Sequence, residues 1–379
     1  MGYHLEKGIY PLMTRILSIA TAGLRPEQFT DVNHLHFPRV DYIELQDLLN
    51  VETIDYSAYN QRYMGKIFRN LETQMRSDIY LAILGWWRKR EHPLVFAWSE
   101  RVGIPLAAFK RVLRSNDRFV TMFHCWSERQ ELAITKLNLF SVMDEIIVHC
   151  HSMKENLARL GAPDEKVKVI HYSIDQNFFS PLKEVEQIPN MVMSIGEPRS
   201  RHYSLLFQAV DGLSVNLSVA GFGQWYAREK SNSYKGTVPQ NVIMTKHLPQ
   251  AELRKLYASS QFVVLPIRDL VYSAGATAAL EAGSMARAVI AFHSEGITDY
   301  IIDGETGILV ESGNVSAMRD AIQYLVANPR EAKRLGQNAR QRIVEQFTLE
   351  AYVSSIADLL MENEKEGKRS VSRVRLTVA

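Results

Sequence analysis

The chain has 379 residues, of which 46% are hydrophobic and 23% charged, and its formal net charge is +2. This length predicts two domains with sizeable hydrophobic cores, and the balanced charge argues against a nucleic-acid partner. The two cysteines, Cys125 and Cys150, are too few for a disulfide framework. The chain also has no apolar run near the roughly 18 residues that span a bilayer. The low cysteine count and the lack of such a run together favour a cytoplasmic protein that is at most peripheral to a membrane.

One segment is locally basic. Between residues 88 and 118, eight Lys and Arg side chains face three Asp and Glu side chains, a balance of 8 − 3 = +5, and Trp86 and Trp87 precede the segment. The pattern is compatible with contact between this segment and an anionic membrane surface. A solvated helix face is the commoner explanation of such a pattern.

The first half of the chain alternates short apolar runs with longer amphipathic segments. The runs are RILSIAT, VDYIEL, PLVFAWS, RFVTMFH and DEIIVHC, which begin at residues 15, 40, 93, 118 and 144. Such alternation is typical of strand and helix units on a parallel sheet. We therefore expect a Rossmann-like domain over residues 1–182.

The alternation restarts after a connector at residues 177–190. The new runs are MVMSIG, VNLSVAG, NVIMT, FVVLP, RAVIAF and GILVE, between residues 191 and 311. They predict a second Rossmann-like domain over 183–346, followed over 347–379 by a helix that crosses back to the first domain and a loose basic tail. The fold class is thus α/β, with two doubly wound domains whose ligand site lies in the cleft at the strand ends.

The stretch VYSAGATAALEAG, residues 271–283, follows one of these runs directly. Its Ala-rich text predicts a helix from Ala274 to Met285, with Ser273 as N-cap. The free N–H groups at such a helix start attract phosphate, and Glu281 lies about 12 Å further along the axis. The helix therefore fits a nucleotide site, and an Ala-rich core helix with one Glu is the alternative.

Residues 115 to 360 resemble, in order, the family-4 glycosyltransferases, which have the GT-B fold. The resemblance is carried by MDEIIVHCHSMKENLARLGAP, MVMSIGEPRSRHYS, LPQAELRKLYASSQFVVLP, YSAGATAALEAG and IIDGETGILVESGN. It implies a retaining enzyme that moves a hexose-type sugar from a nucleoside-diphosphate sugar to a glycan or lipid-linked acceptor in polysaccharide biosynthesis. It also implies that the donor binds mainly to the C-terminal domain.

The family's Glu-x7-Glu signature falls on Ser273 and Glu281. Glu281 is implied to hold the ribose hydroxyls, whereas Ser273 replaces the first Glu within a Tyr-Ser-Ala-Gly wording found in one branch of the family. The backbone of Gly275 and Ala276 is implied to meet the diphosphate. The full set of implied donor residues is Gly23, Arg199, His202, His247, Leu248, Ser273, Ala274, Gly275, Ala276, Thr277 and Glu281.

Two further residues are implied to take part in catalysis. The family usually places an Arg and a Lys against the leaving diphosphate; here Glu197 stands at the Arg position and His202 near the Lys position, so Arg201 is the expected cation. A solvated loop of mixed charge is the alternative. His124 matches a His that faces the donor sugar, with a satisfied core or rim histidine as its alternative. Glu100 and Arg101, after the run FAWS, are additional cleft candidates.

The chain contains no Asp-x-Asp pair, which favours transfer without a metal, and no cofactor is expected. The family implies front-face attack, in which the leaving phosphate takes the acceptor proton. A protein of the same fold that binds the nucleotide sugar or acts as a scaffold, without turnover, is the second hypothesis. It is motivated by Ser273 and Glu197.

Two other signals are weak. GFGQWYA, residues 221–227, imitates a dinucleotide fingerprint, but the next strand, NVIMT, is followed by Lys246 and His247 instead of an acid. VHCHS places His149 and His151 on one face of a strand. Two ligands without a second pair are a weak metal signal, and a polar pair at a strand end is the commoner arrangement.

Overall fold

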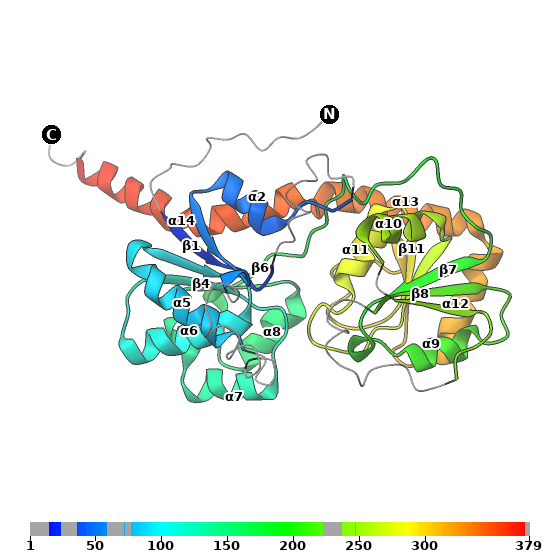
Figure 1. Cartoon of the computed structure of the whole chain (residues 1–379), viewed down its shortest axis with the longest axis horizontal. Coiled ribbons are helices and arrows are strands. Elements are labelled where there is room, and N and C mark those ends of the chain that lie inside the picture. The colour runs from blue at the N-terminus through cyan, green and yellow to red at the C-terminus, as the bar shows by residue number, and fades with distance from the viewer. Residues whose placement is uncertain are drawn as a thin grey trace.

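The computed structural model describes residues 15–23, 36–58, 72, 77–222, 237–246 and 248–375. Figure 1 shows two domains side by side, each with a central sheet and helices on both faces, and a long C-terminal helix that passes from one domain to the other. Within the described residues, each sheet has six strands, all parallel.

The N-terminal sheet has the strand order β2-β1-β3-β4-β5-β6. Its strands are β1 (Ile16–Ile19), β2 (Val51–Ile54), β3 (Leu94–Ala97), β4 (Arg118–Met122), β5 (Glu145–Val148) and β6 (Val167–Val169). Its helices are α2 (Asp41–Leu48), α5 (Ile79–Arg88), α6 (Glu100–Leu113), α7 (Glu128–Lys136) and α8 (His151–Arg159), with short 3-10 turns at Lys89–Glu91, Leu139–Val142 and Asp164–Lys166.

The run VDYIEL forms helix α2, so its expected role as a strand was wrong. Tyr42 and Leu45 are buried within α2 and Leu49 is buried at its C-cap, at a spacing of three and four residues that suits a helix and not a strand. The strand of this unit is the shorter VETI of β2, which pairs with β1 at the sheet edge.

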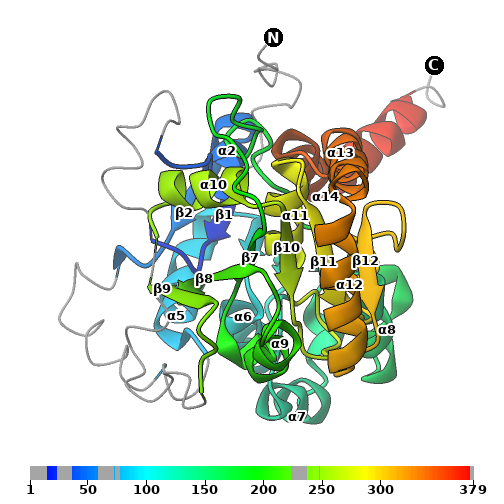
Figure 2. The ribbon, with the colours of Figure 1, turned by 90° about the vertical axis from the view of Figure 1, so that its right-hand side faces the viewer.

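The C-terminal sheet has the order β12-β11-β10-β7-β8-β9. Its strands are β7 (Met191–Ile195), β8 (Asn216–Phe222), β9 (Val242–Lys246), β10 (Phe262–Leu265), β11 (Ala288–Phe292) and β12 (Gly307–Val310). Its helices are α9 (Tyr203–Val210), α10 (Gln250–Ser259), α11 (Ala276–Ser284), α12 (Val315–Ala327) and α13 (Pro329–Gln346), with a 3-10 turn at Pro198–Ser200. Helix α9 packs beside α12, and α11 beside α13 (Figure 2).

The strand order reverses at one point in each sheet. In the C-terminal sheet, β7 and β10 are neighbours; β8 and β9 follow on the side of β7, and β11 and β12 on the side of β10. In the N-terminal sheet, the order reverses in the same way between β1 and β3. Open parallel sheets bind ligands at the carboxyl ends of such strands. The two reversal points thus mark where the site is expected.

Helix α14 (Leu349–Arg375) crosses to the N-terminal domain and packs beside α2 (Figure 1). Val353, Ile356 and Leu360 share a hydrophobic cluster with Ile16, Phe96 and other side chains from one face of that sheet. The helix continues to Arg375, so most of the expected loose tail is helical.

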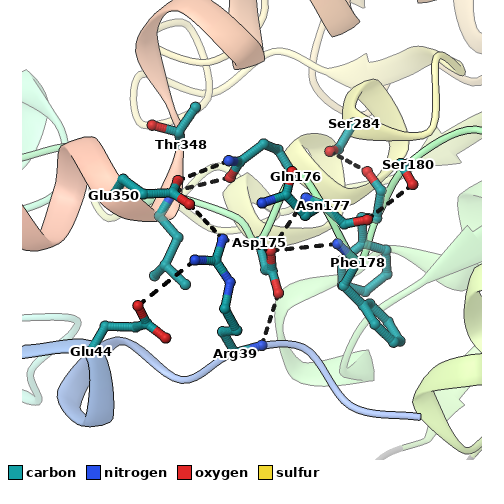
Figure 3. Close-up of polar contacts among 12 residues, drawn as sticks. Arg39, Glu44, Asp175, Gln176, Asn177, Phe178, Ser180, Ser284, Thr348 and Glu350 are labelled. Atoms are coloured by element: carbon teal, nitrogen blue, oxygen red, sulfur yellow. Dashed lines mark hydrogen bonds and ion pairs between the residues drawn. The ribbon is translucent and has the colours of Figure 1, made fainter. Parts of the chain in front are cut away.

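The connection between the domains is held by polar contacts (Figure 3). The guanidinium of Arg39, before α2, pairs with Asp175 in the connection at 3.0 Å and with Glu350 of α14 at 2.7 Å. Ser284, at the end of α11, donates to the carbonyl of Phe179 in the same connection. The short segment from Asp175 to Phe179 therefore contacts both domains, and Arg39, which it binds, also contacts the crossing helix.

Candidate functional site

A cleft of about 560 Å³ lies between the domains. From the C-terminal domain it is lined by side chains and backbone of residues 195–201, which follow β7, and of residues 272–281, which lead into and form α11. The N-terminal domain contributes Glu100, Arg101, Cys125, Trp126 and Gln130. The cleft is thus open to the carboxyl ends of β7 and β10 on one side and of β3 and β4 on the other.

The N-terminus of α11 points into this cleft with free donors. Helix α11 begins at Ala276 and its N-cap is Gly275, with φ +88°, so the expected cap at Ser273 was wrong. The φ of Gly275 is in the left-handed region, which favours glycine, and the N-cap therefore lies two residues after the position that the composition predicted. Within the described part of the chain, the amides of Thr277 and Ala278 donate no hydrogen bond, as is usual in a first helical turn.

Arg201 lies beside this helix start, and its residue is only 5% exposed. Its Nε donates to the carbonyl of Ile195 at 3.0 Å and its Nη1 to the hydroxyl of Ser200 at 3.0 Å. Nη2 lies 3.7 Å from the place a Cβ on Gly275 would occupy. Gly196, at φ +129°, leaves the room for this guanidinium, because a Cβ there would approach it to about 2.4 Å.

The charge of Arg201 has no carboxylate within ion-pair distance among the residues that the structure describes. Burial lowers the pKa of its guanidinium. A buried, uncompensated cation is costly in the empty protein. The arrangement therefore suits an anionic ligand.

Glu281 lies further along α11 and also lines the cleft. The hydroxyl of Tyr257, in α10, donates to its Oε2 at 2.7 Å. Burial raises the pKa of the Glu281 carboxyl to about 7, against a smaller lowering by this hydrogen bond.

Ser273 is buried and does not line the cleft, although its neighbours Tyr272 and Ala274 do. Burial raises the pKa of the Cys150 thiol and of the Tyr300 hydroxyl, and interaction with the nearby Ser273 side chain lowers both by a smaller amount. The residue at the first position of the family signature thus faces the domain contact instead of the open cleft.

The other expected donor residues are spread more widely. Arg199 is exposed and lines the cleft, together with Ala274, Gly275 and Thr277. His202 does not line it: its amide donates to the carbonyl of Pro266 at 2.6 Å, and burial and Arg268 lower the pKa of its imidazole. Ala276 is fully buried as the first residue of α11.

Two donor predictions lie away from the cleft lining, and a third falls on a residue that the structure does not describe. Leu248 packs against the hydrophobic core of the C-terminal domain, and His247 lies outside the described residues. Gly23 follows β1 and lies near Tyr56, away from the cleft lining.

His124 stands at the end of β4, but both of its ring nitrogens have partners inside the protein. Nε2 donates to the carbonyl of Trp98 at 2.7 Å, and the hydroxyl of Tyr172 donates to Nδ1 at 2.6 Å, a tautomer assigned from these contacts. The ring also stacks with His149, with centroids 4.8 Å apart. Its next neighbours, Cys125 and Trp126, are the residues that reach the cleft.

Glu100 is the buried carboxylate of the N-terminal wall, with 3% of its surface exposed. It is the first residue of α6, and its Oε2 accepts the amide of His124 at 2.9 Å. Burial raises the pKa of this carboxyl. Arg101 also lines the cleft, but its charge is matched by Asp78, at 2.8 and 2.9 Å.

The two weak signals resolve differently. His149 and His151 do not share a face: His149 is buried at the end of β5 and stacks on Tyr172, whereas His151 begins α8 and contacts Asp299. The change from strand to helix at Cys150 separates them. Of GFGQWYA, only Gly221 and Phe222 lie within the described residues, as the end of β8.

The basic segment carries less free charge than its composition suggests. Five of its eight cations pair with a carboxylate, namely Arg88, Lys89, Arg101, Lys110 and Arg118. Exposed apolar side chains nevertheless gather there, with Trp87 76%, Val112 74% and Leu113 57% exposed. Across the described ranges, no helix is both long enough and apolar enough to span a membrane.

Residues 181–342 match the family described as glycosyl transferases group 1, in the domain that carries Arg201 and Glu281. In this part, the chain is similar to a group 1 glycosyl transferase domain. The match covers every described strand of the C-terminal sheet, β7 to β12, together with α11, and the N-terminal wall of the cleft lies outside it.

Similar curated proteins cover part of the chain. The chain is 26% identical over 148 residues to a GDP-mannose-dependent alpha-(1-6)-phosphatidylinositol monomannoside mannosyltransferase of Mycolicibacterium smegmatis, which is 38% of this chain and 39% of that protein. It is 33% identical over 109 residues to an alpha-maltose-1-phosphate synthase of Mycobacterium tuberculosis, 27% of either protein. The aligned part thus spans about a quarter to two fifths of these relatives.

Solved structures extend the likeness to the whole fold. Sucrose-phosphate synthase from Thermosynechococcus elongatus superposes with a TM-score of 0.70 at 17% identity, over 93% of this chain and all of that one. HepE of Anabaena, in complex with UDP and glucose, superposes with a TM-score of 0.66 at 14% identity, over 92% of this chain and all of that one. The region that matches the family is therefore half of a GT-B fold.

Some of the site lies outside what the sequence indicated. Tyr257, which bonds Glu281, lies near the end of α10, in the segment LPQAELRKLYASSQFVVLP, but nothing in that segment singled it out as a site residue. Trp126 and Gln130 line the cleft from the start of α7. Gly196 was visible as the residue that ends MVMSIG. A glycine directly after a buried strand is the signal that could have indicated its close approach to Arg201.

Proposed function

We propose that the protein is a retaining, metal-independent glycosyltransferase. It moves a hexose-type sugar from a nucleoside-diphosphate sugar to a glycan or lipid-linked acceptor. The observation that carries this is the placement of Arg201, buried and without a carboxylate partner, beside the free amides of α11 in the cleft. A diphosphate is the anion that a helix start and an arginine together bind best.

The donor would lie along the C-terminal wall. Its diphosphate would sit at Gly275, Thr277 and Arg201, and its ribose at Glu281, whose carboxylate accepts hydroxyl hydrogens. One relative named as GDP-mannose-dependent, and a structural neighbour solved with UDP and glucose, support a nucleoside-diphosphate hexose as the class of donor.

In the transfer step, the acceptor oxygen forms a bond to the anomeric carbon on the face that the diphosphate leaves. The bond to the diphosphate oxygen breaks with its electron pair, and the acceptor proton passes to that oxygen. Arg201 and the α11 amides stabilise the charge that develops on the leaving group. No protein nucleophile takes part, so the serine at position 273 is compatible with turnover.

The acceptor would lie along the N-terminal wall. The carboxylate of Glu100 and the ring of Trp126 offer a hydrogen-bond acceptor and an apolar face for a sugar hydroxyl and a sugar ring. His124 would act by holding Glu100 in place through its backbone amide, since its ring nitrogens are engaged elsewhere.

The experiment that tests this function follows release of nucleoside diphosphate from a panel of nucleotide sugars, without acceptor and with glycan or lipid-linked acceptors. Steady release that an acceptor accelerates is the expected result. Binding of a nucleotide sugar with no release under any condition would favour the second candidate, a binding or scaffold protein of the same fold, which the serine at position 273 motivates.

For location, we propose a cytoplasmic protein that is peripheral to an anionic membrane surface in polysaccharide biosynthesis. The exposed Trp87 and Val112 lie near the ends of α5 and α6. These two helix ends are in contact, because the rings of Trp86 and Phe109 pack together with their centroids 6.1 Å apart. Vesicles containing anionic lipid should retain the protein, and Trp87→Ser with Val112→Ser should release it. Retention that these changes leave unaltered would contradict this location.

A further inference from the structure

A second polar cluster joins the two domains away from the cleft. It consists of His151 at the start of α8, His171 in the connection after β6, and Asp299 between β11 and β12. None of the three lines the cleft. Their ligand atoms, one from each side chain, all lie within 4.8 Å of one another.

Both imidazoles converge on one carboxylate oxygen. Oδ2 of Asp299 is 2.9 Å from Nδ1 of His151 and 3.1 Å from Nε2 of His171. A tetrahedral zinc ion binds nitrogen and oxygen at about 2.0–2.2 Å, which places neighbouring ligand atoms roughly 3.3 Å apart. The two distances to Asp299 are close to this value, whereas the imidazole nitrogens lie up to 4.8 Å apart, so an ion enters when the exposed His151 ring moves toward His171.

Two of the three residues, His171 and Asp299, are held in place by their surroundings. The His171 ring meets Tyr300 and Phe347 edge to face, at interplanar angles of 88° and 84°. Arg342 donates to the carbonyls of Asp299 and Tyr300, at 3.0 and 2.8 Å, and directs its charge to the backbone and not to the carboxylate. Such outer contacts orient metal ligands in advance.

We propose that His151, His171 and Asp299 bind a divalent transition-metal ion, with zinc as the best fit. Two imidazoles and one carboxylate suit zinc, whereas magnesium and calcium prefer oxygen ligands alone. The fourth position is left to water, which has access because the His151 side chain is 66% exposed. The ligands come from the N-terminal domain, the connection and the C-terminal domain, so the ion fixes the relative placement of the domains. This site is independent of the proposed transfer reaction.

The test uses full-length protein stripped of metal with a chelator and titrated with zinc chloride, by calorimetry and by thermal unfolding. We expect one equivalent to bind and to raise Tm by several degrees. His151→Ala should abolish both effects without loss of fold, because its side chain is exposed, and Asp299→Asn should weaken binding at least tenfold. His293→Ala, an exposed histidine outside the cluster, is the matched control and should behave as the unmodified protein.

Absence of zinc binding in the unmodified protein, or an equal Tm rise in His151→Ala, would overturn the site. An equal rise with magnesium chloride would contradict the assignment of the donor set. Nucleotide binding is measured in the same metal-free samples, so failure of the metal site is distinguishable from failure of the proposed transferase function.

Discussion

The two walls of the cleft are built in different ways. The C-terminal wall comes from two short segments, within residues 195–201 and 272–281. Its ligand groups are backbone amides, the arginines Arg199 and Arg201, and the carboxylates of Glu197 and Glu281. The N-terminal wall is assembled from scattered side chains after β3 and β4, chiefly Glu100 and Trp126. The first wall suits a constant ligand, a diphosphate with a ribose, and the second suits a variable one.

The two walls also differ in whether their buried or half-buried arginines are paired with a carboxylate. In the C-terminal wall the charge of Arg201 is uncompensated among the described residues, whereas in the N-terminal wall Arg101 is paired with Asp78. A buried charge without a partner carries a desolvation penalty, which binding of an anionic ligand would offset. Electrostatic binding should therefore depend on the C-terminal wall, and discrimination between acceptors on the N-terminal wall.

The largest effect is expected from Arg201→Met. Loss of the cation beside the leaving group should lower kcat about 10²- to 10³-fold, as removal of a charge-stabilising donor does elsewhere. Rates of nucleoside-diphosphate release measure this, with Tm as a check on folding. Arg199→Met is the matched comparison, because that exposed arginine lines the same wall, and its effect should stay below about tenfold. Equal losses in both variants would remove the special role of the buried arginine.

Glu100→Gln tests the opposite wall. A hydrogen bond to a charged group contributes about 1.5–3 kcal/mol, so kcat/KM for the acceptor should fall about 10- to 100-fold. The dissociation constant for the nucleoside diphosphate should remain unchanged, because the proposed nucleotide site lies on the C-terminal wall and Glu100 is not part of it. Isothermal titration and initial rates separate the two quantities. Weaker nucleotide binding in this variant would contradict the division between the walls.

Donor binding should depend on pH through Glu281. Its carboxyl has a pKa of about 7 in the empty protein, so it is protonated below that pH, and only the ionised form accepts both ribose hydroxyls. Affinity should rise with pH and level off above 7, with binding at pH 6 about tenfold weaker than at pH 8. Glu281→Gln should lose this part of the dependence and retain only that of the phosphate groups. Identical pH profiles for the two proteins would exclude ionised Glu281 from the site.

The smallest effect is expected from Ser273→Ala. The hydroxyl lies near Cys150 and Tyr300 and not in the cleft, so its loss should change the free energy of unfolding by about 1 kcal/mol and kcat by less than about threefold. A large fall in kcat with unchanged stability would place Ser273 at the donor sugar after all.

Much of the fold could be predicted from the sequence because both sheets are parallel and buried on both faces. Runs such as FVVLP and RAVIAF are continuous apolar strands, and their alternation with helices indicates the topology. VDYIEL misled because a run of six residues fits a strand or a half-buried helix equally well. The N-cap was misplaced because Ser273 and Gly275 are both good cap residues, and the φ of the glycine decides between them.

The site was predictable where its chemistry is local and not where it depends on distant contacts. Arg201, Gly275 and Glu281 belong to segments whose spacing carries information. The hydrogen bonds of His124 to Trp98 and Tyr172, and the cluster of His151 with Asp299, join residues 26 to 148 positions apart. No pattern within one strand or helix reveals such pairs.

The central claim is that Glu281 and the start of α11 hold the nucleotide of a sugar donor. The most direct measurement is the thermal shift of the full-length protein with a panel of nucleoside diphosphates and their sugar derivatives, beside Glu281→Ala. At about 100 times its dissociation constant, a ligand stabilises the fold by about 2.7 kcal/mol. We predict that one base gives a clear shift and that Glu281→Ala removes it; a panel in which no nucleotide raises Tm, or a shift that the variant retains in full, would contradict the account.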